Sequence, residues 1–236
     1  MIDKQIATAQ EAVADIPDNA TVMVAGFGES GSPIELLHAL IDQGAKNLTI
    51  ISNNAGSGQV GLAALIAQHR VAKIICSFPR SANGTEFTAL YQNGEIGLEL
   101  VPQGTLAERI RAGGAGIPAF YTPTAAGTLL AQGKETRQFE GRYYVMETAL
   151  RADFALIKSA CADRYGNLVY HRTARNFSPI MAMAATTTIV QTSELVEAGA
   201  IDPEVVVTPG IYVNRTVVIS QPVHESALIR QGSRYP

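Results

Sequence analysis

The chain has 236 residues, of which 47% are apolar and 17% are charged, and its formal net charge is −3. This apolar fraction excludes a disordered chain, and a charged fraction below the usual value of about 25% favours an oligomer that buries part of its surface. Because no basic face, no apolar run of about 18 residues and no signal peptide is recognisable, we predict no nucleic-acid partner, no membrane partner and a cytoplasmic location.

The first half of the chain alternates short β-branched runs with amphipathic stretches, a pattern that predicts strands alternating with helices. The run TVMVA at 21–25 leads into the loop GFGESGSP and then into a helix. Ser32 suits the N-cap of this helix, Pro33 its first turn and Gly44 its end. The same pattern predicts further strands at 48–52, 72–77 and 98–102 and further helices at 60–70, 85–94 and 105–114.

Between about 117 and 150 the chain becomes rich in Gly, Pro and aromatic residues, which predicts an inserted antiparallel flap. Strands that alternate with helices form a parallel sheet. We therefore predict an α/β fold with an open, mostly parallel sheet, helices on both faces and this small flap, in one domain over 1–220. An irregular, loosely held tail is expected at 221–236. The later elements are expected as strands at 153–160, 168–172, 187–192, 203–210 and 212–220 and a helix at 178–186.

A glycine loop follows the first predicted strand, where Gly26, Gly28 and Gly31 spell GxGxxG. Such a loop lets backbone N–H groups approach a pyrophosphate at a helix N-terminus. A dinucleotide site also needs an acidic residue at the end of the second strand, but that strand ends in Ser52 and two asparagines. The loop is therefore interpreted as an anion cradle rather than a nicotinamide site, with a tight turn that needs glycine only for steric reasons as the alternative.

Three amides occupy the ends of neighbouring predicted strands. Asn53 and Asn54 follow the second strand, and Gln103 stands between a strand and a helix. Carboxyl ends of parallel strands meet at one edge of a sheet, so we expect these side chains to share a rim with the glycine loop. Paired amides suit a carboxylate or a carbonyl. An Asx turn that caps the next helix is the alternative for either asparagine.

Nucleophilic machinery is not recognisable in the sequence. His38, His69, His171 and His224 are scattered without a suited nucleophile, so each is interpreted as a surface or core residue. Glu29 lies inside the glycine loop, where a carboxylate is more often solvated than catalytic. The two cysteines, Cys76 and Cys161, form no CxxC motif and have no His at ligand spacing, which predicts buried thiols and no metal site. The polar residues therefore describe half of an active site.

A series of long, ordered motifs resembles the A subunit of 3-oxoacid CoA-transferases over about residues 3–220. The motifs are dispersed over nearly the whole chain, so coincidence is implausible. They read DNATVMVAGFGESGSP, ISNNAG, ICSFPR, LVPQGTLAERIRAGGAG, YTPTAAGT, ADFALIK, GNLVYHRTARNF and VVTPGI.

The resemblance implies an enzyme that moves CoA from succinyl-CoA to a 3-oxo acid and acts only together with a second chain, the B subunit. The nucleophilic glutamate belongs to that B subunit, so no catalytic residue is expected in this chain. CoA would be a substrate, with no permanently bound cofactor, and the assembly would be an A2B2 heterotetramer. This chain alone is predicted to be inactive.

Site residues are carried over from the resemblance position by position. The CoA-binding loop would start at Ala25, where the family usually has glycine, so a contact that requires a positive φ at this position is doubtful. Gly113, Gly114 and Gly116 match a family glycine run that a helix end explains equally well. The carried-over residues are Ala25, Gly26, Phe27, Gly28, Glu29, Ser30 and Gly31 for CoA, and Asn53, Asn54 and Gln103 for the acid substrate.

The substrate is predicted to be 3-oxoadipate, because SNNAG, CSFPR and RNFSPIMAMAA look most like the subunits that act on it. GGAGIPAFYTPT looks more like those that act on acetoacetate, which is the alternative. The second carboxylate of 3-oxoadipate would need a cation, and Arg80 or Arg175 is the hypothesis for it. A phosphate-binding sensor or isomerase domain of the same fold is the alternative from another class.

Overall fold

The computed structural model describes residues 2–79 and 86–235. Within these residues a large sheet has the order β1-β12-β11-β9-β2-β3-β4-β5, and β10 pairs with β9 off this path. All pairs are parallel except β9 with β10. The strands are β1 (Gln5–Ile6), β2 (Thr21–Val24), β3 (Leu48–Ser52), β4 (Val71–Cys76), β5 (Gly97–Leu100), β9 (Ala152–Asp163), β10 (Leu168–Val169), β11 (Ala185–Val196) and β12 (Arg215–Val218).

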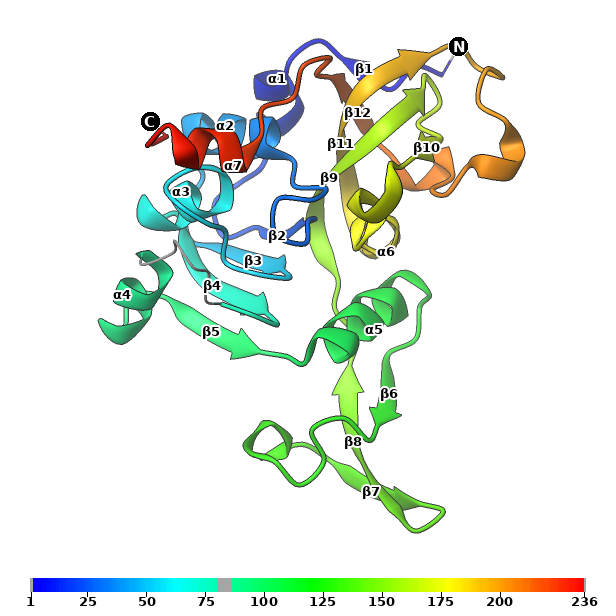
Figure 1. The fold of residues 1–236 in the computed structure, drawn as a ribbon. Helices are drawn as coiled ribbons and strands as arrows, with labels where there is room; N and C mark the ends of the chain where they lie inside the picture. The colour runs from blue at the N-terminus through cyan, green and yellow to red at the C-terminus, as the bar shows by residue number, and fades with distance from the viewer. Residues whose placement is uncertain (1, 80–85, 236) are drawn as a thin grey trace.

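Helices cover both faces of this sheet (Figure 1). One core cluster joins the sheet to four helices, and a second cluster on the opposite face joins it to two. The first face carries α1 (Ala9–Val13), α2 (Ile34–Gln43), α3 (Gly61–Ala67) and α4 (Glu86–Gln92), and the second carries α5 (Gln103–Gly114) and α6 (Ser178–Ala184). The predicted α/β fold with a mostly parallel sheet is confirmed.

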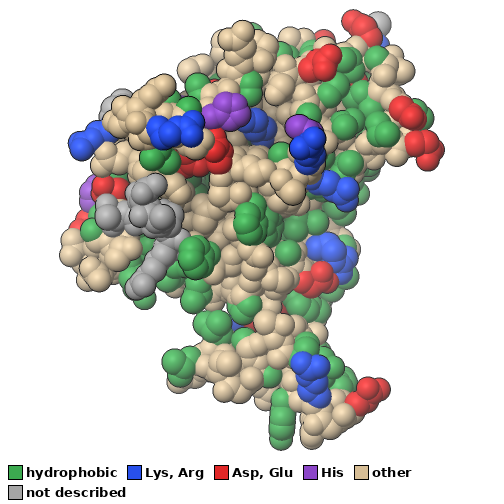
Figure 2. Space-filling model, in the orientation of Figure 1, with side chains coloured by type: hydrophobic (Ala, Val, Ile, Leu, Met, Phe, Trp, Pro, Cys, Tyr) green, Lys and Arg blue, Asp and Glu red, His purple; other side chains and the backbone are tan. Residues whose placement is uncertain are grey.

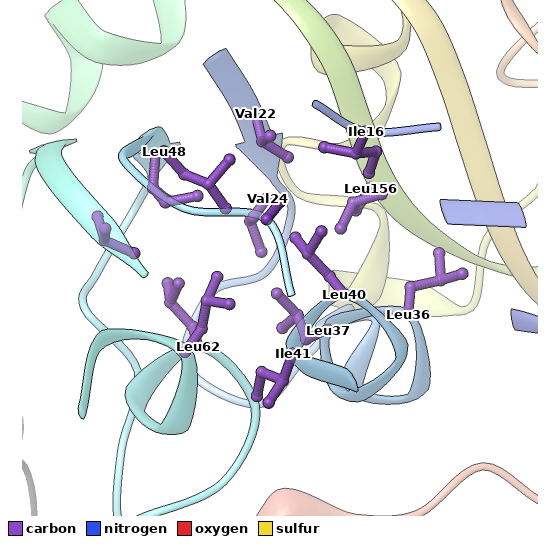
Figure 3. Close-up of a cluster of buried hydrophobic side chains, with 14 of the residues drawn as sticks. Ile16, Val22, Val24, Leu36, Leu37, Leu40, Ile41, Leu48, Leu62 and Leu156 are labelled. Carbon is purple, nitrogen blue, oxygen red and sulfur yellow. The ribbon is translucent and has the colours of Figure 1, made fainter. Parts of the chain in front are cut away.

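Successive side chains of the central strands point to opposite faces of the sheet, which explains the two core clusters. Val22 and Val24 point into the first cluster, where they meet Leu40 of α2 (Figure 3), whereas Met23 between them belongs to the second. Val22, Met23 and Val24 are each at most 1% exposed. Strands buried on both faces read as continuous apolar runs, which is why these strands are recognisable in the sequence.

The predicted flap is a separate three-stranded antiparallel sheet in the order β6-β8-β7 that projects from the main body (Figure 1). Its strands are β6 (Ala119–Thr122), β7 (Thr136–Phe139) and β8 (Arg142–Thr148), with the short 3₁₀ helix η1 (Leu129–Ala131) before β7. Glu140 and Gly141 turn β7 into β8 with φ of 48° and 78°, as a two-residue hairpin requires.

Buried charges tie the flap to α5. Arg109, 6% exposed, donates from Nε to the Thr148 carbonyl at 2.7 Å and from Nη1 to Glu99 at 2.8 Å. Glu147, 3% exposed, lies 3.8 Å from the same guanidinium and accepts from Lys134 Nζ at 2.6 Å. Each buried charge therefore has a partner of opposite sign, which offsets its desolvation.

The glycines at the end of α5 serve packing. A Cβ at Gly113 would lie 1.9 Å from the Leu150 carbonyl oxygen, and one at Gly114 would lie 2.6 Å from Met183 Cβ. Gly116 follows the helix with φ of 74°. Close approach to the neighbouring segments therefore accounts for the first two glycines, and the end of the helix accounts for the third.

Three local predictions are wrong. Residues 203–210 form no strand but contain η3 (Pro203–Val205), and η4 (Gly210–Tyr212) follows, because prolines there remove ladder donors. The strand at 168–172 is only Leu168–Val169, antiparallel to β9, and gives way to η2 (Arg172–Arg175). Helix α2 has Pro33 rather than Ser32 at its N-cap, with no side-chain cap, whereas Gly44 ends it in the left-handed conformation as predicted.

The prediction of an irregular, loosely held tail is also wrong. The segment 221–236 contains α7 (Glu225–Arg230), which lies beside α2 and α3 (Figure 1). Tyr235 stacks on His38 with ring centroids 3.6 Å apart and donates to Asp42 at 2.8 Å. The Val223 N–H donates to Glu35 at 2.7 Å. These contacts join residues far apart in the sequence, so composition alone does not indicate them.

Candidate functional site

The carboxyl ends of β2 and β9 define the candidate site. From β2 the sheet continues through β3, β4 and β5 on one side, and from β9 through β11 and β12 on the other. The order of strands therefore reverses between β2 and β9. Open α/β sheets bind ligands at the carboxyl ends of their strands at such a point. The glycine loop, residues 25–31, follows β2 at this place.

The glycine loop is clamped by the segment that follows η2. Asn176 Oδ1 accepts from the Gly26 N–H at 3.2 Å, and its Nδ2 donates to the Ser30 carbonyl at 2.8 Å. Gly31 has φ of 78°, and a Cβ there would lie 2.4 Å from the Ala174 carbonyl oxygen. The steric interpretation of the glycine therefore holds at Gly31.

Other positions of the loop face outward. Gly28 has φ of 58°, and a Cβ there would meet nothing within 4 Å, while Phe27 is 54% exposed. Ala25 is buried and is not among the residues with positive φ, so its backbone does not require the glycine usual in the resembled family. The outward part of the loop is available to a ligand, and its assignment to CoA stays a prediction.

Two of the predicted amides come together. Asn53 is 4% exposed, and its Oδ1 accepts from Gln103 Nε2 at 2.8 Å and from Ser77 Oγ at 2.7 Å. Gln103 is the first residue of α5, so the structure joins the ends of β3, β4 and β5 at this point. Both contacts involve the Asn53 oxygen and orient the amide. A role of its Nδ2 donors in substrate binding stays a prediction. Ser77 is the member of this cluster that sequence reasoning missed.

Asn54 is placed differently. Its Oδ1 accepts from the Gly56 N–H at 2.8 Å, which forms an Asx turn. This turn does not cap the next helix as the alternative supposed, because α3 has Val60 at its N-cap and no side-chain cap. Together with Gly26, Gly28 and Glu225 it borders a narrow cleft beneath the glycine loop. The structure therefore brings Asn54 to the loop, whereas Asn53 pairs with Gln103. A role of Asn54 in substrate binding stays a prediction.

Glu29 and Glu225 bring two carboxylates to the glycine loop. Glu29 lies 3.4 Å from His224 Nδ1, and Glu225 accepts from the Ser57 N–H at 3.3 Å. Burial, together with the smaller effect of the nearby Glu29 charge, raises the pKa of Glu225 to about 7. The tail thus contributes a protonatable group that sequence reasoning missed because it expected the tail to be loose.

A pocket of about 420 Å³ lies on the β9 side of the glycine loop. The loop residues Glu29 and Ser30 form one wall, and Lys158 and Ser159 of β9 form another. On the face of the molecule shown in Figure 2, Lys and Arg side chains are scattered and form no continuous basic stripe. Lys158 was not predicted as a site residue, because a single lysine in an apolar strand gives no signal of its own.

Arg80 and Arg175 are the two arginines proposed to bind the second carboxylate of 3-oxoadipate. Arg80 lies outside the described residues. Arg175 ends η2 and is exposed. Burial raises the pKa of Tyr170, which lines the 420 Å³ pocket, and the nearby charge of Arg175 partly opposes this shift. Arg175 therefore stands near the rim of this pocket, and its role stays a hypothesis.

The remaining histidines and cysteines show no ligand arrangement. His38 Nε2 accepts from the Gly61 N–H at 3.0 Å, and burial lowers the pKa of His38 to about 4. Cys76 is buried and Cys161 is half-buried. Among residues 2–79 and 86–235, no three His, Cys, Asp or Glu side chains are grouped to hold a metal ion. No helix within those ranges combines the length and apolar character that a membrane span requires.

The fold is thus an open α/β sheet whose carboxyl edge carries a glycine loop and paired amides, at the place where such sheets bind small ligands. Comparison with known families identifies it further. The sequence profile described as coenzyme A transferase matches residues 6–219, so the chain belongs to the coenzyme A transferase family. The resemblance drawn from its motifs is thereby confirmed.

Several relatives are similar over nearly their whole length. The chain is 56% identical over 220 residues to the A subunit of 3-oxoadipate CoA-transferase from Pseudomonas putida, covering 93% of this chain and 95% of the relative. It is 57% identical to the protein of that name from Acinetobacter baylyi, covering 93% and 96%. It is 51% identical to the A subunit of succinyl-CoA:3-ketoacid coenzyme A transferase from Xanthomonas campestris pv. campestris, covering 98% and 96%. The designation of these relatives as subunits indicates a partner chain.

Solved structures share the fold at lower identity. An acyl-CoA transferase of Escherichia coli O157:H7 matches with a TM-score of 0.81 at 24% identity, covering 94% of this chain and 48% of that longer chain. Glutaconate coenzyme A-transferase of Acidaminococcus fermentans matches with a TM-score of 0.81 at 19% identity, covering 91% and 75%. These matches support the arrangement of the sheet and the flap described above.

Proposed function

We propose that this chain is the A subunit of a CoA-transferase that moves CoA from succinyl-CoA to 3-oxoadipate. The observation that carries the proposal is the 56–57% identity, over 93% of the chain, to two relatives named as A subunits of 3-oxoadipate CoA-transferase. The amide pair of Asn53 and Gln103 supports it, because neutral donors at the carboxyl edge of the sheet suit a carboxylate that becomes an oxyanion during transfer.

The chemistry implied by the family places the nucleophilic glutamate on the partner subunit. Its carboxylate attacks the thioester carbonyl of succinyl-CoA. The CoA thiolate is expelled, and an acyl-glutamyl anhydride forms. The thiolate then attacks the glutamyl carbonyl and releases succinate, which leaves a glutamyl-CoA thioester for the second acid to attack. Each step develops negative charge on a carbonyl oxygen, and removing one preorganised donor to such an oxyanion costs about 10² to 10³ in rate.

Within this chain, we assign the acid substrate to Asn53, Asn54 and Gln103 and the CoA contact to the outward part of the glycine loop, 25–31. The exposed Phe27 and the open space above Gly28 support that contact. An A2B2 assembly and a cytoplasmic location stay predictions that follow from the family resemblance and from the sequence.

A transferase acting on acetoacetate is the second candidate, because the chain is also 51% identical to the A subunit of a succinyl-CoA:3-ketoacid coenzyme A transferase. Transfer from succinyl-CoA to 3-oxoadipate and to acetoacetate is therefore measured with this chain alone and with its cognate B subunit. We expect activity only in the mixture and a higher kcat/KM for 3-oxoadipate. Turnover by the chain alone would contradict the assignment of the nucleophile to the partner, and a preference for acetoacetate would establish the second candidate.

A further inference from the structure

The 420 Å³ pocket beside the glycine loop is built from segments that are far apart in the sequence. Its walls are the end of the loop, the stretch Lys158–Ala160 of β9, the segment around Tyr170 and His171, and the tail residues Pro222–His224. A volume of this size is typical of small-molecule sites. The amides assigned to the acid substrate do not line it, so the mechanism proposed above leaves its role open.

One charged group in this pocket lacks a partner within the described chain. Lys158 is half-buried, and its ammonium has no carboxylate within 4 Å and no hydrogen-bond acceptor among the described residues. Its neighbour Ser159 faces the other side of β9, and the buried Ser159 Oγ is closed to the pocket. An ammonium without a partner in a pocket of this size suits an anionic ligand.

The charges of the pocket favour a carboxylate over a phosphate. Lys158 supplies one positive charge, whereas Glu29 on the facing wall supplies a negative charge held near His224. A dianionic phosphate would be repelled by Glu29, while a single carboxylate is balanced by one ammonium. Ile34, Ala160, Ala174 and Val223 add apolar surface that suits a methylene chain.

Strand register relates this pocket to the amides. Val24 of β2 pairs with Leu156 of β9 and with Ser52 of β3, so two residues further on Lys158 stands level with Gly26 and Asn54. Neighbouring strands are about 4.8 Å apart, which places the backbone of β9 about 10 Å from the end of β3. An extended six-carbon acid that accepts a hydrogen bond at each end bridges a gap of this order.

We propose that Lys158 binds the distal carboxylate of a dicarboxylic 3-oxo acid and thereby determines specificity for it over monocarboxylic acids. This inference rests on the proposed function, since it names the part of the chain that recognises the second carboxylate of that substrate. The reacting carboxylate lies at the amides on the other side of the glycine loop.

The kinetic test uses the complex of this chain with its B subunit, supplied with two acceptors of equal length, 3-oxoadipate and 3-oxohexanoate, which lacks the distal carboxylate. Lys158→Met is expected to raise KM for 3-oxoadipate about 10- to 100-fold, as for the loss of a hydrogen bond to a charged group, and to leave KM for 3-oxohexanoate unchanged. Lys158→Arg should recover part of the loss. The control is Lys46→Met, at the exposed turn before β3 on the opposite edge of the sheet. Equal effects of Lys158→Met on both acids, or none, would overturn the proposal.

A binding measurement separates this inference from the proposed function. Calorimetry of the same complexes with adipate and hexanoate is expected to show weaker adipate binding in Lys158→Met and unchanged hexanoate binding. If the wild-type complex does not use 3-oxoadipate, the proposed substrate is wrong, but the adipate titration still decides whether Lys158 binds a distal carboxylate.

Discussion

Replacing Asn53 by aspartate is the perturbation whose effect the structure defines most closely. The Asn53 oxygen accepts from Ser77 at 2.7 Å and from Gln103 at 2.8 Å, and an aspartate can keep both contacts. The exchange removes the Nδ2 donors, which costs about 10² to 10³ in rate if they face a developing oxyanion. It also adds a charge that repels a substrate carboxylate about 4 Å away by about 4 kcal/mol at an effective dielectric constant of about 20. We therefore expect kcat/KM to fall by at least about 10³-fold.

The assay is succinyl-CoA transfer to 3-oxoadipate by the complex that carries Asn53→Asp, with the unfolding midpoint measured alongside. Asn53→Ala removes the donors without adding charge and should lose only about 10² to 10³ in rate. Asn47→Asp, on an exposed turn at the opposite edge of the sheet, is the matched control and should keep full activity. Retention of kcat/KM within about tenfold by a folded Asn53→Asp complex would refute a role for this amide in oxyanion stabilisation.

Two further predictions concern stability. Arg109→Met removes the hydrogen bonds of a buried guanidinium to the Thr148 carbonyl and to Glu99, while Glu147 keeps Lys134 at 2.6 Å. The variant should destabilise the chain by about 1.5 to 3 kcal/mol in urea unfolding, whereas Arg111→Met, in an exposed pair on the same helix, should leave the stability nearly unchanged. Similar losses in both variants would contradict the interpretation of the buried network. The pKa of Glu225 is raised from 4.5 to about 7, so the folded state holds the Glu225 proton more tightly than the unfolded state. The stability that this protonated carboxyl confers at low pH is therefore lost as the pH rises through about 7. In Glu225→Gln the unfolding midpoint should depend less on pH between about 4.5 and 8 than in the wild type. An unchanged pH dependence would contradict this assignment.

The central sheet follows from sequence because its strands carry their own signal. Val22, Met23 and Val24 are apolar in succession because both faces of β2 are covered, and the glycine loop marks the point where this strand ends. The convergence of Asn53 and Gln103 was predictable on the same grounds, since parallel strands bring their carboxyl ends to one edge. These features depend on local pattern and on a topological rule, and neither requires knowledge of side-chain packing.

Features fixed by long-range contacts were not predictable in this way. The tail reads as polar and irregular, yet Tyr235 stacks on His38 and the N–H of Val223 bonds to Glu35, nearly two hundred residues away in sequence. The amide orientation of Asn53 likewise depends on Ser77, which belongs to the segment after a different strand. A sequence pattern reports what a residue prefers locally, and these partners are set only when the strands take their order in the sheet.

The surroundings of the glycine loop explain why the sequence contains GxGxxG without the acidic residue of a dinucleotide site. Strand β9 continues to Asp163, seven residues beyond the pairing of Leu156 with Val24 at the end of β2, so its last part forms a wall facing the glycine loop. The loop therefore lies between two polar regions, the amides at β3 and α5 and the ammonium of Lys158 on β9. A dinucleotide would need a carboxylate near the amides of β3 and α5 to hold its ribose. A dicarboxylic acid substrate instead needs neutral donors near these amides and a cation on the β9 side of the loop. In this arrangement the glycines give the backbone a narrow turn between the two regions, and the charges that flank the turn determine which ligand the edge of the sheet accepts.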